Sequence, residues 1–188
     1  MAIRDSILDN IAVHNLLLEQ EKTIADIAFI IAARIADGGK IMLCGNGGSA
    51  ADAQHFAAEF VGRFKRKRGA WPALALTTDT SVLTCVANDY SFEDVFARQV
   101  DGLACKGDVL VVISTSGNSE NIIRALEAAE KITTVGLLGK DGGEAAALCN
   151  YAIIVPSGNT ARIQEAHATI MHLLCEEVER IFFEEGTK

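Results

Sequence analysis

Two pairs of polar side chains have the spacing expected for metal binding or proton transfer. His55 and Glu59 lie four residues apart in a helical pattern, so both side chains project from the same helix face. Gln164 and His172 lie eight residues apart, about two helical turns, on nearly the same ridge of another helix. Both spacings also occur in helices that carry no chemistry, and the spacing does not favour His172 over His167. A histidine on an apolar helix face is often only a core residue.

A glycine-rich turn precedes the first of these helices. The segment runs Cys44-Gly45-Asn46-Gly47-Gly48-Ser49-Ala50 and follows a short apolar run. Its glycines allow a tight turn and a close backbone approach to a ligand, so it is a candidate cradle for an anion or a sugar. Gly45, Gly47 and Ala50 also fit a dinucleotide-binding pattern, but Asp79 lies too far downstream to be the acid expected about 20 residues on. A glycine-rich turn with no ligand is the third interpretation.

A second turn carries several hydroxyl groups. The apolar run Val109–Ile113 is followed by Ser114-Thr115-Ser116-Gly117-Asn118-Ser119, and a helical pattern begins near Glu120. Hydroxyls and unpaired backbone amides at a helix N-terminus, where the dipole is positive, can bind a phosphate monoester without a lysine. No Walker lysine follows, which argues against hydrolysis of nucleoside triphosphates. The alternative is simple N-capping by one of these side chains, although a cap requires only one hydroxyl.

The elements that must hold these residues follow an alternating α/β pattern. The chain has helical periodicity from about Ser6 to Ala36, which predicts a helical hairpin or one long broken helix. Apolar runs then alternate with helical patterns, and a long helix over Thr160–Glu184 closes the chain. The runs are Lys40–Cys44, Ala73–Thr77, Val109–Ser114, Thr134–Leu138 and Tyr151–Val155. Continuous apolar runs indicate strands buried on both faces, so we expect a three-layer α/β sandwich around a five-stranded parallel sheet, with ligands at the carboxyl ends of the strands.

Composition limits the class of protein. The 188 residues are 49% hydrophobic, enough for one domain with a proper core, and neither a signal peptide nor a membrane span is evident. A net charge of −8 argues against non-specific binding to nucleic acid. Five widely spaced cysteines are expected to be reduced core thiols of a cytoplasmic protein. The one basic run, Arg63–Arg68, is interpreted as a helix end or loop in preference to a patch for an anionic partner.

Taken together, four segments resemble the phosphoheptose isomerase branch of the sugar-isomerase (SIS) domain family. They are Gly45–Glu59, Ala87–Asp89, Ser114–Ser119 and Arg162–Glu165. The hydroxyl loop alone would indicate only a SIS domain, and the narrower identification depends on the two polar pairs described above. Some relatives have an aspartate where Ala161 stands, so one supporting polar contact is expected to be absent here.

The resemblance implies a flavodoxin-like SIS domain over residues 1–188, with a helical segment over 1–37 and an α/β core over 38–188. It also implies a homotetramer with active sites between subunits, and one zinc ion per subunit. The implied metal ligands are His55, Glu59, Gln164 and His172, of which Glu59 and His172 would also transfer protons. The phosphate would be held by Ser114, Thr115, Ser116 and Ser119. The sugar would be lined by Asn46, Gly47, Gly48, Asn88 and Asp89, with Glu59 and Gln164 also in contact.

The implied activity converts D-sedoheptulose 7-phosphate to D-glycero-D-manno-heptose 7-phosphate through an ene-diol, the first step of ADP-heptose precursor synthesis for lipopolysaccharide or capsule. Moving a proton along the sugar chain requires a base and an acid, for which we expect Glu59 and His172, and a means of stabilising negative charge. The alternatives are a non-catalytic SIS protein that binds a replication initiator, and a SIS protein that senses a sugar phosphate or isomerises a hexose phosphate. None of these requires both polar pairs.

Overall fold

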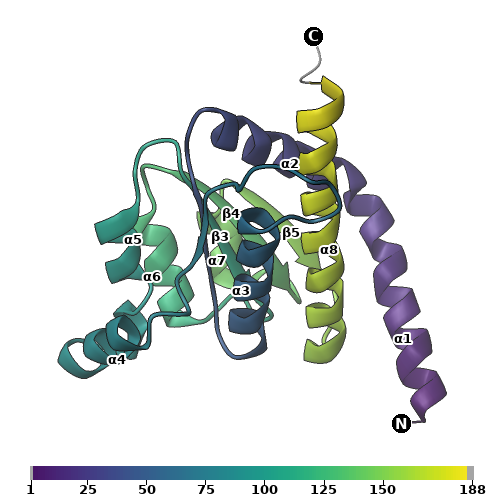
Figure 1. Cartoon of the computed structure of the whole chain (residues 1–188). Coiled ribbons are helices and arrows are strands. Elements are labelled where there is room, and N and C mark those ends of the chain that lie inside the picture. Colours follow the sequence, from purple (N-terminus) through teal and green to yellow (C-terminus); the bar gives the residue numbers. More distant parts are fainter. Residues whose placement is uncertain (1, 186–188) are drawn as a thin grey trace.

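A five-stranded parallel sheet forms the middle layer of the structure, a computed structural model that describes residues 2–185 (Figure 1). The strands are β1 (Ile41–Gly45), β2 (Ala73–Ala75), β3 (Val109–Ser114), β4 (Thr133–Gly139) and β5 (Tyr151–Val155). Their order across the sheet is β2-β1-β3-β4-β5, and every neighbouring pair is parallel. This is the flavodoxin-like order, in which the strand sequence reverses direction between β1 and β3. The predicted fold class is confirmed, and each predicted strand is present with small differences at its ends.

Helices cover both faces of the sheet. Those before β3 are α1 (Ile3–Leu16), the 3-10 turn η1 (Leu17–Gln20), α2 (Glu21–Ala36), α3 (Gly48–Val61), α4 (Thr80–Asp89), the 3-10 turn η2 (Phe92–Asp94) and α5 (Ala97–Leu103). Those after β3 are α6 (Glu120–Ala128), α7 (Gly143–Leu148), α8 (Thr160–Arg180) and the π-helical turn η3 (Ile181–Glu185). The predicted last helix is therefore present, but its final turn is π-helical.

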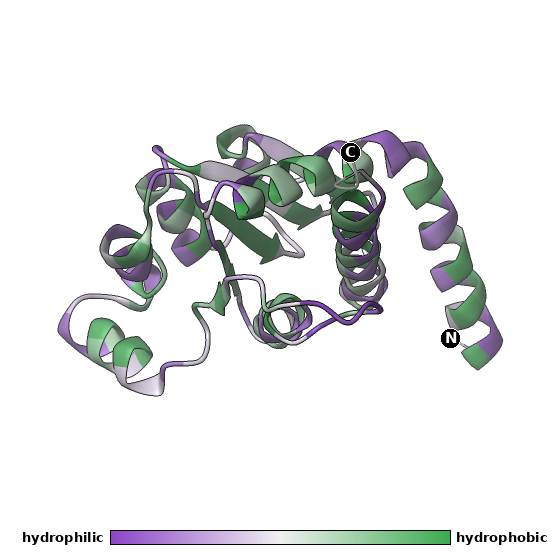
Figure 2. Cartoon of the chain, turned by 45° about the horizontal axis from the view of Figure 1, so that its top comes forward, coloured by the Kyte–Doolittle hydropathy of each residue, from purple (hydrophilic) through white to green (hydrophobic). Residues whose placement is uncertain are grey.

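Alternate residues of the central strands face opposite layers. In β1, Ile41 and Leu43 pack in one core with α2, α3 and α8. Met42 and Cys44 pack in a second core with residues of α4, α5, α6 and α7. All residues of β1 and β3 are buried, and the strands are drawn largely in the hydrophobic colour in Figure 2. The continuous apolar runs of the sequence thus correspond to strands covered on both faces.

The two N-terminal helices run in different directions on either side of η1, which corresponds to the predicted broken helix (Figure 1). α1 projects from the body beside α8. His14 Nε2 lies 2.9 Å from Thr169 Oγ1, and Asn10 donates a 2.5 Å hydrogen bond to Glu165. Large apolar side chains elsewhere on α1 are exposed. They are Ile3, Ile7, Leu8 and Ile11.

Two compositional expectations can be compared with the structure. Between residues 2 and 185, none of the helices combines the length and hydropathy that crossing a membrane requires. All five cysteines are free thiols. Cys44 and Cys175 are buried and Cys149 is half-buried, but Cys85 and Cys105 are exposed. The expectation that all five belong to the core is therefore wrong for these last two.

The buried residue Asp108 links the starts of three strands through its carboxylate and its backbone carbonyl. Asp108, which precedes β3, accepts hydrogen bonds from the backbone amides of Lys40 (2.9 Å) and Cys105 (2.7 Å) and pairs with the Lys40 ammonium group. Its carbonyl oxygen accepts a hydrogen bond from the Thr133 amide at the start of β4. Burial alone would raise the pKa of Asp108, but the hydrogen bonds from Lys40 and Cys105 and the charge of Lys40 lower it overall.

Asp108→Asn should lower the free energy of unfolding by about 2 kcal/mol at pH 7, because the amide nitrogen cannot accept from Cys105 and the Lys40 charge loses its partner. The native pKa of Asp108 is depressed, so its stabilisation is present above the unfolded-state pKa of about 3.9 and is lost as the pH falls through the native value. The difference between the two proteins should therefore shrink below about pH 4. Urea unfolding at several pH values measures this difference, and a constant difference at low pH would contradict the assignment.

Candidate active site

The hydroxyl-rich loop lies where β3 ends and α6 begins. Ser114 is buried, and its Oγ accepts a 3.0 Å hydrogen bond from the Gly117 amide. Ser116 Oγ accepts one of 3.2 Å from the Asn118 amide. Gly117 has a φ of +66°, and a Cβ there would lie 1.9 Å from the Gly142 carbonyl oxygen, so the turn requires glycine. The loop is thus held in one shape by its own hydrogen bonds.

The N-terminus of α6 has no side-chain cap. Ser119 is the N-cap residue, but its side chain makes no capping hydrogen bond, so simple capping does not account for the hydroxyls. The first amides of a helix have no partner within the helix and carry the positive end of its dipole. Together with the hydroxyls of Thr115 and Ser119, these amides can bind a phosphate group.

A cavity of about 210 Å³ opens onto this loop. Its other walls come from the turn after β1 and the first turns of α8. The lining residues are Asn46, Ser49, Ile113, Ser114, Thr115, Ser116, Ser119, Thr160 and Gln164. The turns that follow β1 and β3 therefore share one polar pocket, at the crevice where ligands bind in parallel α/β sheets.

The glycine-rich turn holds Asn46 at the edge of this cavity. Asn46 and Asn121 exchange two side-chain hydrogen bonds of 2.8 and 2.9 Å, which fix the orientation of the Asn46 amide. Asn121 is buried in the first turn of α6 and so links the two turns. Gly47 has a φ of +57°, and a Cβ on Gly48 would lie 2.3 Å from Gln164 Nε2. The first glycine is required by backbone conformation and the second by the closeness of α8.

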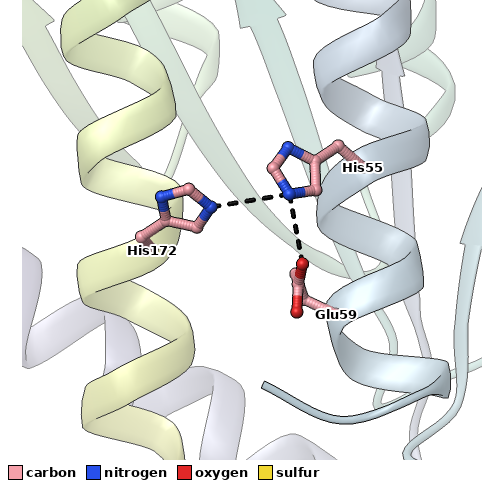
Figure 3. Close-up of side chains that lie close together, drawn as sticks. All are labelled: His55, Glu59 and His172. Carbon is pink, nitrogen blue, oxygen red and sulfur yellow. Dashed lines mark hydrogen bonds and ion pairs between the residues drawn. The ribbon is translucent and has the colours of Figure 1, made fainter. Parts of the chain in front are cut away.

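His55, Glu59 and His172 come together between α3 and α8 (Figure 3). Glu59 Oε1 lies 3.1 Å from His55 Nε2, and His172 Nε2 lies 3.5 Å from the same nitrogen. One potential ligand atom from each side chain lies within 4.8 Å of the others. Two imidazoles and a carboxylate are a donor set that suits zinc and other divalent ions. The structure thus brings together three of the four side chains expected to bind a metal.

Gln164, the fourth expected ligand, lines the cavity at the hydroxyl loop. It precedes His172 by eight residues on α8, which corresponds to about 12 Å along the helix axis. Its amide lies close to Gly48 in the first turn of α3. In this conformation Gln164 is therefore a cavity residue.

The surroundings of the two histidines in α8 are different. His167 is fully buried, and its Nε2 donates a 3.1 Å hydrogen bond to the Leu138 carbonyl in β4. Burial lowers the pKa of His167 to about 4, although the hydrogen bond opposes this shift, so the imidazole is neutral near pH 7. His172 instead faces His55, with ring centroids 5.1 Å apart. His167 is therefore enclosed in the core, and His172 is the histidine of α8 that lies beside His55 and Glu59.

Asn88 and Asp89 lie at the exposed end of α4. Asn88 donates a 2.7 Å hydrogen bond to Asp89, and the Cys85 thiol lies 3.4 Å from the same carboxylate. In Figure 1, α4 and α8 are on opposite sides of the molecule. Neither residue lines the cavity that the hydroxyl loop shares with the glycine-rich turn.

Several neighbours of the site were not predicted from the sequence. Ser49 and Thr160 line the cavity, and Asn121 orients Asn46. The Phe64 ring stacks on the His172 imidazole, with centroids 5.5 Å apart. The position of Asn121, two residues after the hydroxyl loop and in the first turn of the predicted helix, was a usable signal for it. Phe64 lies within the basic run, where nothing local indicates contact with a histidine on another helix.

Residues 10–139 match the SIS domain family, so the fold and the site define a SIS-domain protein. The phosphoheptose isomerase of Nitratiruptor is 64% identical over 145 residues, which cover 76% of this chain and 78% of that protein. The phosphoheptose isomerase of Aquifex aeolicus is 56% identical over 163 residues, covering 86% of this chain and 85% of that protein. The solved structure of phosphoheptose isomerase from Neisseria gonorrhoeae has a TM-score of 0.89 at 42% identity, covering 94% of this chain and 96% of that chain.

Identities of this size over most of both chains are sufficient to assign the family. The chain belongs to the phosphoheptose isomerases, a branch of the SIS domain family. The resemblance inferred from the four sequence segments is thereby confirmed.

Gly48→Ala tests the close approach of α3 and α8. The new Cβ would lie 2.3 Å from the far end of the flexible Gln164 side chain, so we expect Gln164 to be displaced while the fold persists. The free energy of unfolding should change by less than about 1 kcal/mol. The affinity of the metal-free protein for sedoheptulose 7-phosphate, measured by calorimetry, should fall about tenfold because one hydrogen-bonding group is lost.

Gly102→Ala is the matched control, since its Cβ would meet nothing within 4 Å. Equal affinities in the two variants would show that Gln164 does not contribute to binding.

Proposed function

We propose that this chain converts D-sedoheptulose 7-phosphate to D-glycero-D-manno-heptose 7-phosphate, a precursor of ADP-heptose for lipopolysaccharide or capsule. Its relatives are named phosphoheptose isomerases, and the chain is accordingly a sugar-phosphate isomerase. Within the structure, the observation that supports the proposal is the group formed by His55, Glu59 and His172 on the two helices that border the cavity at the hydroxyl loop.

The spacing between the cavity and this group suits a long phosphorylated sugar. Both α3 and α8 border the cavity near their N-termini, at Ser49 and Gln164. His55 follows Ser49 by six residues and His172 follows Gln164 by eight residues, roughly 9 Å and 12 Å along the respective helix axes. A phosphate bound at the hydroxyl loop therefore leaves the other end of an extended sugar chain near Glu59 and His172. Holding the reacting carbons in this position is itself a large part of catalysis.

Glu59 and His172 are placed to move protons at that end of the sugar. We assign Glu59 as the base that takes the carbon-bound proton, and His172 as the group that exchanges protons with the sugar oxygens. They lie on facing helices, so they can approach the substrate from two sides (Figure 3). Two side-chain amides are available for hydrogen bonds to the sugar hydroxyls. One belongs to Asn46 and is oriented by Asn121, and the other belongs to Gln164.

We propose one zinc ion per subunit, held by His55, Glu59 and His172. The proximity of these three donors supports it. Gln164 is the proposed fourth ligand, and its side chain would have to turn from the cavity toward the group. When bound, zinc would polarise a sugar oxygen and stabilise negative charge on it. A carboxylate that binds a metal is a weaker base, so Glu59 can act as the base only while its own contact with the metal is weak.

We also propose that residues 1–188 form a single SIS domain. The chain would assemble as a cytoplasmic homotetramer, with active sites between subunits. Neither nucleic acid nor a membrane is proposed as a partner. The exposed apolar residues of α1 support assembly, since Ile3 is 83% exposed and Ile7 is 55% exposed. Asn88 and Asp89, which do not line the cavity, would then contact the sugar in the site of a neighbouring copy.

The alternatives are a regulator that binds a replication initiator and a sensor of sugar phosphates. Both would use the SIS fold and the hydroxyl loop, but neither needs a carboxylate beside two histidines. The grouping of these three side chains therefore favours the enzyme.

Glu59→Gln tests the assignment of the base. The amide has nearly the same shape but cannot take a proton, so kcat should fall by about 10²–10⁴-fold with KM little changed. The measurement is the formation of aldoheptose 7-phosphate, together with the zinc content of the purified variant. Glu127→Gln, at an exposed position of α6, is the control and should retain wild-type turnover. Near-normal turnover of Glu59→Gln with zinc still bound would show that another group is the base.

Removal and restoration of zinc tests the metal. Chelation should abolish conversion of sedoheptulose 7-phosphate, and added zinc should restore it. The circular dichroism spectrum should not change, because the His55 side chain is 46% exposed and the group lies outside the two apolar cores. Conversion that survives complete chelation would contradict the zinc proposal. Sugar phosphate binding without any conversion in the presence of zinc would instead favour the sensor.

A further inference from the structure

We propose that Arg68 and Glu179 are a buried positioning pair, which orients Glu59 from one side and His172 from the other. The inference rests on the proposed function of the His55, Glu59 and His172 group and names the residues that hold this group in place. The side chains of the pair are almost inaccessible to solvent, at 5% exposed for Arg68 and 2% for Glu179. Both act on the group indirectly, through the backbone and through the ring of Phe64.

Glu179 organises the loop that follows α3. It lies near the end of α8, and its carboxylate accepts hydrogen bonds from three consecutive backbone amides, those of Phe64 (3.2 Å), Lys65 (3.1 Å) and Arg66 (2.9 Å). The same carboxylate accepts a 3.1 Å hydrogen bond from Arg68 Nε. A buried carboxylate with this many donors fixes a loop more firmly than an exposed ion pair, whose partners stay hydrated.

Arg68 completes the hydrogen bonds at the C-terminal end of α3. Its guanidinium donates to the carbonyl oxygens of Glu59 (2.7 Å) and Phe60 (2.8 Å), in the last turn, where carbonyls lack amide partners within the helix. The helix dipole also favours a cation at this end. The Trp71 ring lies over the guanidinium, with its centroid 3.7 Å from the central carbon. Because Glu59 is one of the two residues bonded, Arg68 helps to set the backbone from which its carboxylate projects.

The loop held by Glu179 also touches His172. Phe64, whose amide donates to Glu179, places its ring against the His172 imidazole, with centroids 5.5 Å apart and planes inclined by 16°. This stacking restricts rotation of the imidazole, whose Nε2 faces His55. Glu179 follows His172 by seven residues on α8, about two turns along the same side. The end of α8, the loop after α3 and the Phe64 side chain therefore form a continuous set of contacts around Glu59 and His172.

The same contacts explain one cation of the basic run. Residues 63–68 were predicted to be a solvated helix end or loop, and Lys65 does pair with Glu176 at the surface. Arg68 differs because its side chain is buried, and its partners are a carboxylate and the carbonyl oxygens of Glu59, Phe60 and Gly69. Its charge is thus engaged within the fold and is not available to an external anion.

The test uses the full-length, zinc-loaded protein. Arg68→Lys keeps the charge but loses the planar fork that reaches several acceptors, and Phe64→Leu removes the stacked ring without changing the buried pair. In both variants kcat for sedoheptulose 7-phosphate should fall about 10–100-fold. KM should change by less than about threefold, because the hydroxyl loop is untouched. Zinc affinity, measured by chelator competition, should fall by about 10–100-fold as well.

Phe64→Tyr keeps the ring and should restore turnover and zinc affinity to near wild-type values. Glu176→Gln is the matched control, because Glu176 lies on the same helix and pairs with the same loop, but at an exposed position where little is expected from its loss. Thermal unfolding of every variant separates loss of folding from loss of positioning. If Arg68→Lys does not fold, the two Phe64 variants decide the question.

Folded Arg68→Lys and Phe64→Leu proteins with wild-type kcat and zinc affinity would overturn the inference. A wild-type protein that does not convert the sugar phosphate would refute the proposed function instead. In that case the zinc affinities of the variants would still decide whether the pair positions the group.

Discussion

The parallel pairing of β1 with β3 is the interaction on which the site depends. Its register places Gly45 beside Ile113, so the turns that follow the two strands begin side by side at one edge of the sheet. α3 then packs on one face of the sheet and α6 on the other, which opens the crevice between the turns. The Asn46–Asn121 amide pair spans that crevice. A shift in register would separate the glycine turn from the hydroxyl loop and divide the cavity.

The site also requires α8 to lie against α3, because neither helix alone carries the complete group of His55, Glu59 and His172. Apolar side chains such as Phe60 and Leu174 hold the layer together, but apolar contacts are not directional. Directional contacts come from buried polar groups: His167 donates to Leu138 at the end of β4, and Glu179 binds the loop after α3. Breaking a buried ion pair costs about 3–5 kcal/mol, so contacts that orient this helix also contribute to the stability of the fold.

The sequence was most informative where the structural signal is local. Val109–Ile113 is apolar without interruption because both faces of the strand are covered, and the predicted strand, Val109–Ser114, has the limits of the observed one. The hydroxyl loop and the pairing of His55 with Glu59 are local features as well, one a turn and the other a helix spacing. The contact of Phe64 with His172 depends on how distant segments pack, and it leaves no periodic pattern in the sequence. For the same reason, the sequence did not show that Asn88 would lie at the exposed end of α4 and outside the lining of the cavity.

The charge distribution determines how the cavity can select a ligand. A chain with a net charge of −8 repels a phosphate at long range, so attraction must come from donors at short range. Among the described residues that line the cavity, none is a lysine or an arginine, and the available donors are hydroxyls, side-chain amides and helix-end amides. Such donors act only within hydrogen-bonding distance and in particular directions. A free phosphate would therefore gain little binding free energy from this site. A phosphorylated sugar long enough to extend from the hydroxyl loop to His172 would contact polar groups at both ends of the site. In the proposed site, the spacing of groups along α3 and α8 would therefore set the length of the sugar phosphate that is selected.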